Sequence, residues 1–215
     1  MLNDYFRQIY LINLARRADK LSRVLWGLDR EKIRVKVMVA IDGADPKNHY
    51  VQNRIPAGAY AYYLTWRQVL EEILEVCQSD KTSNKTVKFL ILDDDIILHR
   101  QFSSLFDKLI NGLNSNWKIL LLGATQHSKI DKIKHKIKHE IKHEKEISTY
   151  HPLRTDGSFA VALQGIEVIK DLLSLIDPLC PRYLDSDVLR TLYASPAYIG
   201  NCYVAFPNLM IAAVD

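Results

Sequence analysis

Cysteine is scarce in this chain, and long apolar runs are absent from it. The 215 residues include three cysteines, Cys77, Cys180 and Cys202, whose odd number and wide spacing give neither a disulfide framework nor a zinc knuckle. We therefore expect a reducing compartment. No apolar run reaches the roughly 18 residues of a membrane span, and the N-terminus lacks the pattern of a signal peptide. The expectation is a cytoplasmic location without a transmembrane segment.

Glycine and proline are also few, at eight and seven residues, which excludes a low-complexity chain rich in either. With 48% hydrophobic and 25% charged residues, the composition is globular, and the length predicts a single domain over residues 1–215. Of the net charge of +4, a surplus of three lies within Lys129–Glu146. Because a nucleic-acid surface needs basic residues over a whole face, we expect no nucleic-acid partner. The apolar end at 210–215 is typical of a strand cut short, as in a fragment of a longer chain.

Apolar runs that alternate with segments of helical spacing predict an α/β fold. Strands are expected at 5–14, 33–40, 87–92, 117–122, 158–163 and 202–206. Helices are expected at 17–28, 60–77, 102–113, 166–176 and 183–193. Strands that are apolar throughout and joined by helices indicate a mostly parallel central sheet with helices on both faces. Trp26, Trp66 and Trp117 fall within these apolar patterns, so we predict core positions for them rather than platforms for a sugar.

A biased segment at about 129–147 interrupts this pattern, and it is predicted to be a helical insertion between two strands of the core. Isoleucines recur in it every three or four residues, with Lys, His and Glu between them. His135, His139 and His143 fall on one face of such a helix, at a spacing that suits Zn²⁺. Because lysines flank each histidine, a solvated face is the simpler interpretation. An anionic membrane surface is a further alternative.

The strongest chemical signal is Asp93-Asp94-Asp95, directly after the strand expected at 87–92. Ligands bind beyond the carboxyl ends of parallel strands, and adjacent carboxylates need a positive partner. Alternate residues of an extended segment point the same way, so Asp93 and Asp95 are predicted to hold Mn²⁺ or Mg²⁺, with Asp94 turned elsewhere. The alternative is an acidic turn that caps the next helix.

Two other expected strands also end in polar residues. Asn13 ends the first strand, and Arg16 and Arg17 open the helix that follows. Free N–H groups and arginine side chains at a helix start suit phosphate groups, although the same residues also make a plain helix start. Asp42-Gly43 ends the second strand, and taken alone it predicts a turn.

Together these segments resemble glycosyltransferase family 25, which includes lipooligosaccharide galactosyltransferases and procollagen galactosyltransferases. Tyr10–Lys20 resembles the family's first strand and Arg-rich helix start, Ala40–Gly43 its Ala-x-Asp-Gly, and Leu92–Asp95 its Leu-Glu-Asp-Asp signature. Its later motifs are matched by Gly157–Leu163, Leu184–Leu189 and Tyr198–Asn208. The resemblance covers nearly the whole chain apart from the insertion. It implies a GT-A-type, Rossmann-like domain.

The resemblance also implies an activity and roles for single residues. It implies inverting transfer of a hexose, galactose or glucose, from a UDP-sugar to a hydroxyl of a saccharide, glycoprotein or hydroxylysine-type acceptor, with Mn²⁺ or Mg²⁺. Such transfer needs a base for the acceptor hydroxyl. The motif match implies Asp187 or Asp185, with Asp187 the better match. Contacts to the nucleotide-sugar are implied for Asn13, Arg16, Arg17, Asp42, Gly43, Asp94 and Asp156.

The chain departs from the family at two points. Tyr62–Trp66 stands where the family has Cys-x-x-Ser-His, and no histidine follows His151 to serve as a third metal ligand. One alternative is therefore a binding module of this fold that takes a nucleotide-sugar without transferring it. Another is a haloacid-dehalogenase-type phosphatase with Asp93 as nucleophile. That class carries its motif on the first strand, whereas here the motif follows the third.

Overall fold

The computed structural model describes residues 2–48, 55–79, 86–124, 147–152 and 157–213. Its centre is a seven-stranded sheet in the order β2-β1-β3-β7-β5-β8-β6. The strands are β1 Gln8–Asn13, β2 Lys36–Val39, β3 Lys88–Asp93, β5 Ile119–Leu121, β6 Ser148–Tyr150, β7 Ala160–Gln164 and β8 Cys202–Phe206. β1 pairs in parallel with β2 and β3, and β5 pairs in parallel with β8, whereas β7 and β6 run against their neighbours. Five of these strands thus share one direction.

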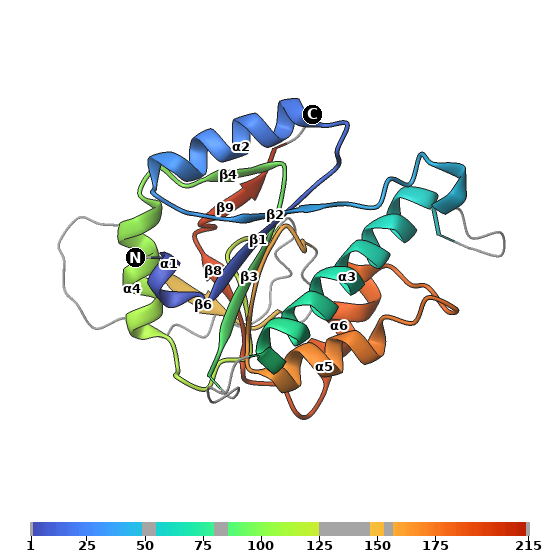
Figure 1. Cartoon of the computed structure of the whole chain (residues 1–215). Coiled ribbons are helices and arrows are strands. Elements are labelled where there is room, and N and C mark those ends of the chain that lie inside the picture. Colours follow the sequence, from blue (N-terminus) through green and yellow to red (C-terminus); the bar gives the residue numbers. More distant parts are fainter. Residues whose placement is uncertain (1, 49–54, 80–85, 125–146, 153–156, 214–215) are drawn as a thin grey trace.

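Helices cover both faces of this sheet (Figure 1). On one face lie α1, α2 and α4, and on the other lie α3, α5, the π-helical turn η2 and α6. Their bounds are α1 Leu2–Tyr5, α2 Ala18–Arg30, α3 Ala57–Ser79, α4 Phe102–Gly112, α5 Ile166–Leu175, η2 Leu184–Leu189 and α6 Arg190–Ala194, with a short 3₁₀ turn, η1, at Pro46–Asn48. The predicted α/β class with a mostly parallel sheet is confirmed, and the arrangement is consistent with a GT-A-like fold.

The central strands are apolar on both faces because each face packs against helices. On β1, Ile9 and Leu11 join the core under α2 and α4, while Tyr10 and Ile12 join the core under α3 and α5. Successive side chains of a strand point to opposite faces, so a strand covered on both sides reads as a continuous apolar run. This burial positions the ends of β1 and β3 firmly at one edge of the sheet.

A two-stranded sheet, β4 Ile96–Leu98 with β9 Met210–Ala212, lies beside the main sheet and beneath α2 (Figure 1). β4 could not be predicted from the sequence, because three residues are too few to show a period. α1 and β6 are likewise short and were not predicted. The strand predicted at 5–14 is shorter than expected, since Tyr5 belongs to α1 and its hydroxyl accepts the indole N–H of Trp117 at 2.9 Å.

The prediction that all three tryptophans are core residues is wrong for Trp26. Trp66 and Trp117 are 0% and 1% exposed, whereas Trp26 is 66% exposed. On α2 the buried side is formed by Val24 and Leu28, one turn apart. Trp26 lies two residues from each, and two residues turn an α-helix by about 200°, so its ring faces solvent. α2 therefore carries a tryptophan on its exposed face.

The predicted insertion lies between β5 and β6, the two strands that flank it in sequence. Its residues 129–146, with His135, His139 and His143, fall outside the described residues, so the helix predicted there stays a prediction. Its last residue, Ile147, is 3% exposed and packs in the core under α1 and α4. Among the described helices, none is both long and apolar enough to cross a bilayer.

Candidate functional site

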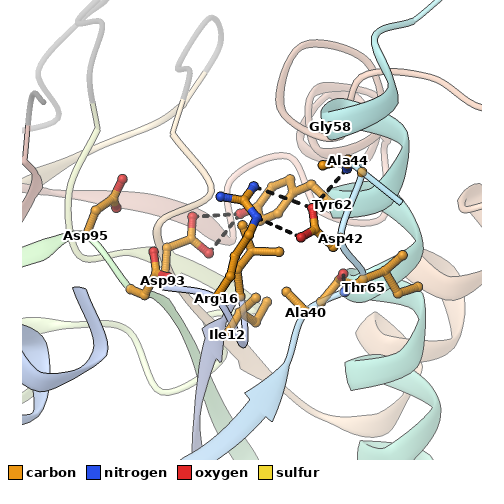
Figure 2. A pocket seen from close by; sticks show the side chains of 14 residues that line it. Ile12, Arg16, Ala40, Asp42, Ala44, Gly58, Tyr62, Thr65, Asp93 and Asp95 are labelled. Carbon is orange, nitrogen blue, oxygen red and sulfur yellow. Dashed lines mark hydrogen bonds and ion pairs between the residues drawn. The ribbon is translucent and has the colours of Figure 1, made fainter. Parts of the chain in front are cut away.

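A pocket of about 440 Å³ opens where β1, β2 and β3 end. These three strands are parallel neighbours, so their carboxyl ends meet at one edge of the sheet. The lining includes several residues singled out from the sequence: Arg16, Asp42, Gly43, Asp93, Asp94 and Asp95. The other lining residues come from the end of β1, from the loop after β2 and from α3 (Figure 2). A crevice beyond the ends of parallel strands is the usual ligand site of such folds.

An arginine–carboxylate pair forms one side of the pocket. Arg16 donates from Nε to Asp42 Oδ2 at 2.7 Å and from Nη2 to Oδ1 at 3.4 Å. The backbone N–H of Ala44 also donates to Asp42 Oδ1, at 2.9 Å. The hydrogen bond from Arg16, with that from Ala44, lowers the pKa of Asp42 below its ordinary value. The pair therefore stays ionised and holds the loop after β2 against the end of β1.

Gly43 allows this loop to pass close to the start of α3. A Cβ at position 43 would lie 2.6 Å from the carbonyl oxygen of Ala57 and 2.7 Å from Cα of Gly58. Both are backbone atoms that cannot turn aside, so any side chain would push the loop away from α3. The Asp-Gly pair thus does more than form a turn, because its glycine lets the loop after β2 pack directly against the start of α3.

Asp93 lies on the opposite side of the pocket, held by a tyrosine from α3. The Tyr62 hydroxyl lies 2.8 Å from Oδ2 and 3.1 Å from Oδ1 of Asp93, and 2.7 Å from Ser158 Oγ. Burial raises the pKa of Asp93 well above its ordinary value; the Tyr62 hydrogen bond opposes this, and Asp95 and Asp185 add to it. Burial also raises the pKa of Tyr62, so its proton stays in place. The surroundings of Asp93 thus disfavour its ionised form.

Asp94 and Asp95 extend this negative charge toward α2. Burial first and Asp95 second raise the pKa of Asp94, and Lys20 opposes the shift. The ammonium of Lys20 lies 3.8 Å from Asp95 Oδ2, with the Lys20 side chain only 10% exposed. Figure 2 shows Asp95 on the far side of Asp93 from the Arg16–Asp42 pair. The pocket therefore has the Arg16–Asp42 ion pair at one end and three carboxylates, with Lys20 beside Asp95, at the other.

The carboxylates of this site are suitable donors for a divalent cation. Mn²⁺ and Mg²⁺ prefer carboxylate oxygens together with water and phosphate oxygens. Burial and neighbouring carboxylates disfavour the charge on Asp93, and a cation would relieve both effects. Within the described ranges, no three His, Cys, Asp or Glu side chains are grouped as a protein-only metal site. Water or a ligand's own oxygens would have to complete the coordination.

Other residues picked out from the sequence lie outside the lining of this pocket. Asn13 is buried, and its side-chain amide donates to the carbonyl of Leu14 at 2.8 Å. Arg17 turns to Asp19 on α2, with 3.3 Å between Nε and Oδ1. Asp156 falls outside the described residues.

The two candidate bases differ in their surroundings. Asp187 uses Oδ2 to accept the backbone N–H of Tyr183 at 3.1 Å, a local bond back to the residue that precedes the turn η2. Asp185 acts electrostatically on Asp93, Tyr62 and Tyr193, raising the pKa of each. Asp185 therefore lies near enough to Asp93 and Tyr62 to act on their charge, although it is not among the residues that line the pocket. Asp187 is engaged in a bond within its own turn.

Sequence reasoning missed three residues of this site, Tyr62, Thr65 and Lys20. Thr65 Oγ1 accepts the backbone N–H of Ile41 at 2.9 Å and donates to the Ala61 carbonyl at 2.8 Å, which ties the loop after β2 to α3. Tyr62 and Thr65 are spaced by three residues on α3, so they share a helix face. That spacing was visible in the sequence, but nothing in it indicated which face meets the pocket.

The chain is similar to known glycosyltransferases. It is 26% identical over 141 residues to procollagen galactosyltransferase 2 of Homo sapiens, and the match covers 55% of this chain and 21% of that protein. It is 25% identical to procollagen galactosyltransferase 2 of Mus musculus, again over 141 residues that cover 55% of this chain and 21% of the relative. The match thus spans about a fifth of the length of these relatives. No protein-family model matches the chain. A solved glycosyltransferase involved in the glycosylation of the major capsid of PBCV-1 has a TM-score of 0.49 and 10% identity, covering 92% of this chain and 79% of that chain. The sequence matches support a relationship to glycosyltransferases.

Proposed function

We propose that the chain is a metal-dependent glycosyltransferase of the family 25 type. It transfers a hexose, galactose or glucose, from a UDP-sugar to a hydroxyl of a saccharide or hydroxylysine-type acceptor, with inversion. The observation that carries this proposal is the single pocket in which Arg16 and Asp42 face Asp93 and Asp95 at the ends of parallel strands. The similarity to procollagen galactosyltransferases supports the same reaction class.

Two features of the pocket suit the negatively charged diphosphate of a nucleotide-sugar. Arg16 lies two residues before α2, and its guanidinium would contact the diphosphate of the donor while Asp42 fixes its orientation. Asp93 and Asp95, at the other end of the pocket, would hold Mn²⁺ or Mg²⁺. When bound there, the cation supplies Lewis-acid stabilisation of the charge on the departing UDP. Tyr62 keeps the Asp93 carboxylate turned into the pocket.

The transfer step requires a base opposite the leaving group. The acceptor oxygen forms a bond to the anomeric carbon while the bond from that carbon to the UDP oxygen breaks, and its electron pair leaves with UDP. The hydroxyl proton passes to a carboxylate. Asp185 is the better candidate, since its charge is felt at Asp93 and Tyr62, whereas Asp187 is engaged with the Tyr183 N–H. The motif match, by contrast, favoured Asp187 over Asp185.

The test is a transfer and hydrolysis assay with a panel of UDP-hexoses, with and without Mn²⁺. Sugar release from one UDP-hexose, dependent on Mn²⁺ and lost in Asp93→Asn, would support the proposal. Asp107→Asn is the matched control, because Asp107 is an exposed carboxylate on α4 outside the pocket. Nucleotide-sugar binding without any turnover would indicate the binding module instead. Capture of a phosphoenzyme on Asp93 would indicate a phosphatase.

A further inference from the structure

A second pocket, of about 420 Å³, lies between α2 and β4. Figure 1 shows these two elements side by side, with α2 lying along the two-stranded sheet. Among the described residues, this pocket has no lining residue in common with the candidate site. Its apolar floor includes Val24 and Ile96, which are 1% and 3% exposed, and its rim carries Trp26 and three arginines.

Trp26 presents a flat aromatic face at this rim. Its side chain is 66% exposed, far more than that of either other tryptophan. The guanidinium carbon of Arg30 lies 5.0 Å from the centre of the Trp26 ring, one helical turn along α2. A stacked arginine fixes the ring and keeps its own donors at the ring's edge. The result is a preformed platform with positive charge beside it.

The rim is strongly basic. Arg23 and Arg30 come from α2, and Arg100 follows β4 from the other side. Glu31 is the one acidic residue among the described lining, and its carboxylate accepts the hydroxyl of Ser103 at 2.5 Å. Three guanidinium groups around one concave surface provide fork-shaped donors that match carboxylate, sulfate or phosphate groups.

We propose that this pocket binds an acidic saccharide. The arginines would take the anionic group, and the Trp26 face would lie against the apolar face of an adjacent sugar ring. The choice of a saccharide, rather than another anion with a flat face, rests on the proposed function, in which a saccharide is one of the two acceptor classes. β4 begins directly after Asp95, and Lys20 of α2 lies 3.8 Å from the same carboxylate. A saccharide held here therefore lies along the two elements that lead into the candidate site.

The experiment is calorimetric titration of the intact chain with two acidic tetrasaccharides, one carboxylated and one sulfated, at low salt. A neutral tetrasaccharide, inorganic phosphate and UDP are titrated in parallel. The variants are Trp26→Ala and Arg30→Ala, both at exposed positions, and the control is Arg190→Ala on α6, an exposed arginine on the opposite face. Trp66 and Trp117 are buried, so a change in tryptophan fluorescence on binding reports on Trp26.

The proposal predicts saturable binding of at least one acidic tetrasaccharide that weakens as salt is added. Trp26→Ala and Arg30→Ala should each weaken it by at least about tenfold, with Arg190→Ala unchanged. Equal binding of the neutral tetrasaccharide, absence of binding by both acidic ones, or affinity unaffected by Trp26→Ala would overturn it. So would tighter binding of phosphate or UDP that both variants weaken. No donor or metal is needed, so a protein that binds these saccharides but transfers nothing would count against the proposed function alone.

Discussion

The hydroxyl of Tyr62 lies 2.8 Å from Asp93 Oδ2 and 2.7 Å from Ser158 Oγ, so one phenol joins α3 to the end of β3 and to the segment before β7. Tyr62 begins the stretch in which this chain departs from the family it resembles. The departure thus places a hydrogen-bond donor on a carboxylate of the proposed metal site. Partners of metal-binding carboxylates orient them, and their loss typically costs 10–100-fold in metal affinity or activity.

Tyr62→Phe should therefore weaken Mn²⁺ activation of transfer by roughly 10–100-fold. The ring stays in place, so the free energy of unfolding should fall by only about 1 kcal/mol. Activity measured against Mn²⁺ concentration, together with thermal melting, separates the two effects. Tyr183→Phe, at a half-exposed tyrosine outside the pocket lining, is the control. An unchanged Mn²⁺ dependence in Tyr62→Phe would show that Tyr62 only packs.

Asp93→Asn should stabilise the metal-free protein while abolishing transfer. The folded-state pKa of Asp93 is raised above its unfolded value of 3.8, so its contribution to stability is greatest below that pH. The contribution is lost as pH rises from the unfolded pKa through the raised folded one. Asn removes this dependence, so the Tm difference from wild type should widen with pH through that window. At this chain length, each kcal/mol corresponds to roughly 2–4 °C in Tm.

The control for that pH series is Asp107→Asn, which removes an exposed carboxylate on α4 outside the pocket. Equal pH dependence in wild type and Asp93→Asn would mean that burial does not strain the ionised Asp93. A bound cation would then relieve no electrostatic cost at Asp93, which would weaken the argument for a metal site there.

Gly43→Ala should destabilise the protein, because the new Cβ would meet the Ala57 carbonyl at 2.6 Å. Overpacking of this kind typically costs about 1–3 kcal/mol, and the displaced loop should also raise the KM for UDP-sugar. Gly58→Ala is the matched control, since a Cβ there meets nothing within 4 Å and alanine favours a helix by up to about 1 kcal/mol. Equal Tm values for the two variants would contradict the close approach of the loop to α3.

Asp185→Asn should reduce transfer by at least about a hundredfold with little change in UDP-sugar affinity, as expected for loss of a base. Asp187→Ala should instead lower stability by about 1 kcal/mol and keep most of its turnover, because it removes only the hydrogen bond that its carboxylate accepts from the Tyr183 N–H. Single-turnover rates and melting curves measure the two effects. The reverse pattern would return the base to Asp187, and normal turnover in both would place it elsewhere.

Replacing residues 129–146 by a short Gly-Ser linker should leave both Tm and UDP affinity nearly unchanged, since the segment's biased composition predicts a peripheral insertion. Ile147 must be kept, because it is buried beside α1 and α4. Ile147→Ala should cost about 2–5 kcal/mol. A large loss of stability in the linker variant would show that the isoleucines of the segment also belong to the core.

The elements with long, strong apolar patterns could be predicted from the sequence, and those set by tertiary pairing could not. β1 and β3 are buried on both faces, so their runs stand out, whereas β4 exists because three residues pair with β9 more than a hundred positions away. Trp26 was misplaced because it lies within an apolar-rich segment whose buried face is formed by Val24 and Leu28. The helical period predicts one buried face and one exposed face, but it does not show on which of them a single tryptophan lies.

Within the candidate site, the sequence indicated residues that directly follow strands. Asp42 and Asp93 both follow or end parallel strands, and the sheet brings those ends together. Tyr62 reaches the site from the side of a helix, a position that depends on how α3 crosses the sheet. The different surroundings of Asp185 and Asp187 depend on the π-helical turn, which sequence periodicity does not show.

Calorimetric titration of UDP into the protein, with and without Mn²⁺, tests whether this pocket is a metal-dependent nucleotide site. We expect saturable UDP binding that requires Mn²⁺ in the wild type and is lost in the double variant Asp93→Asn/Asp95→Asn, with the melting curve showing a folded protein. UDP affinity that is the same without Mn²⁺, or the same in the double variant, would contradict it.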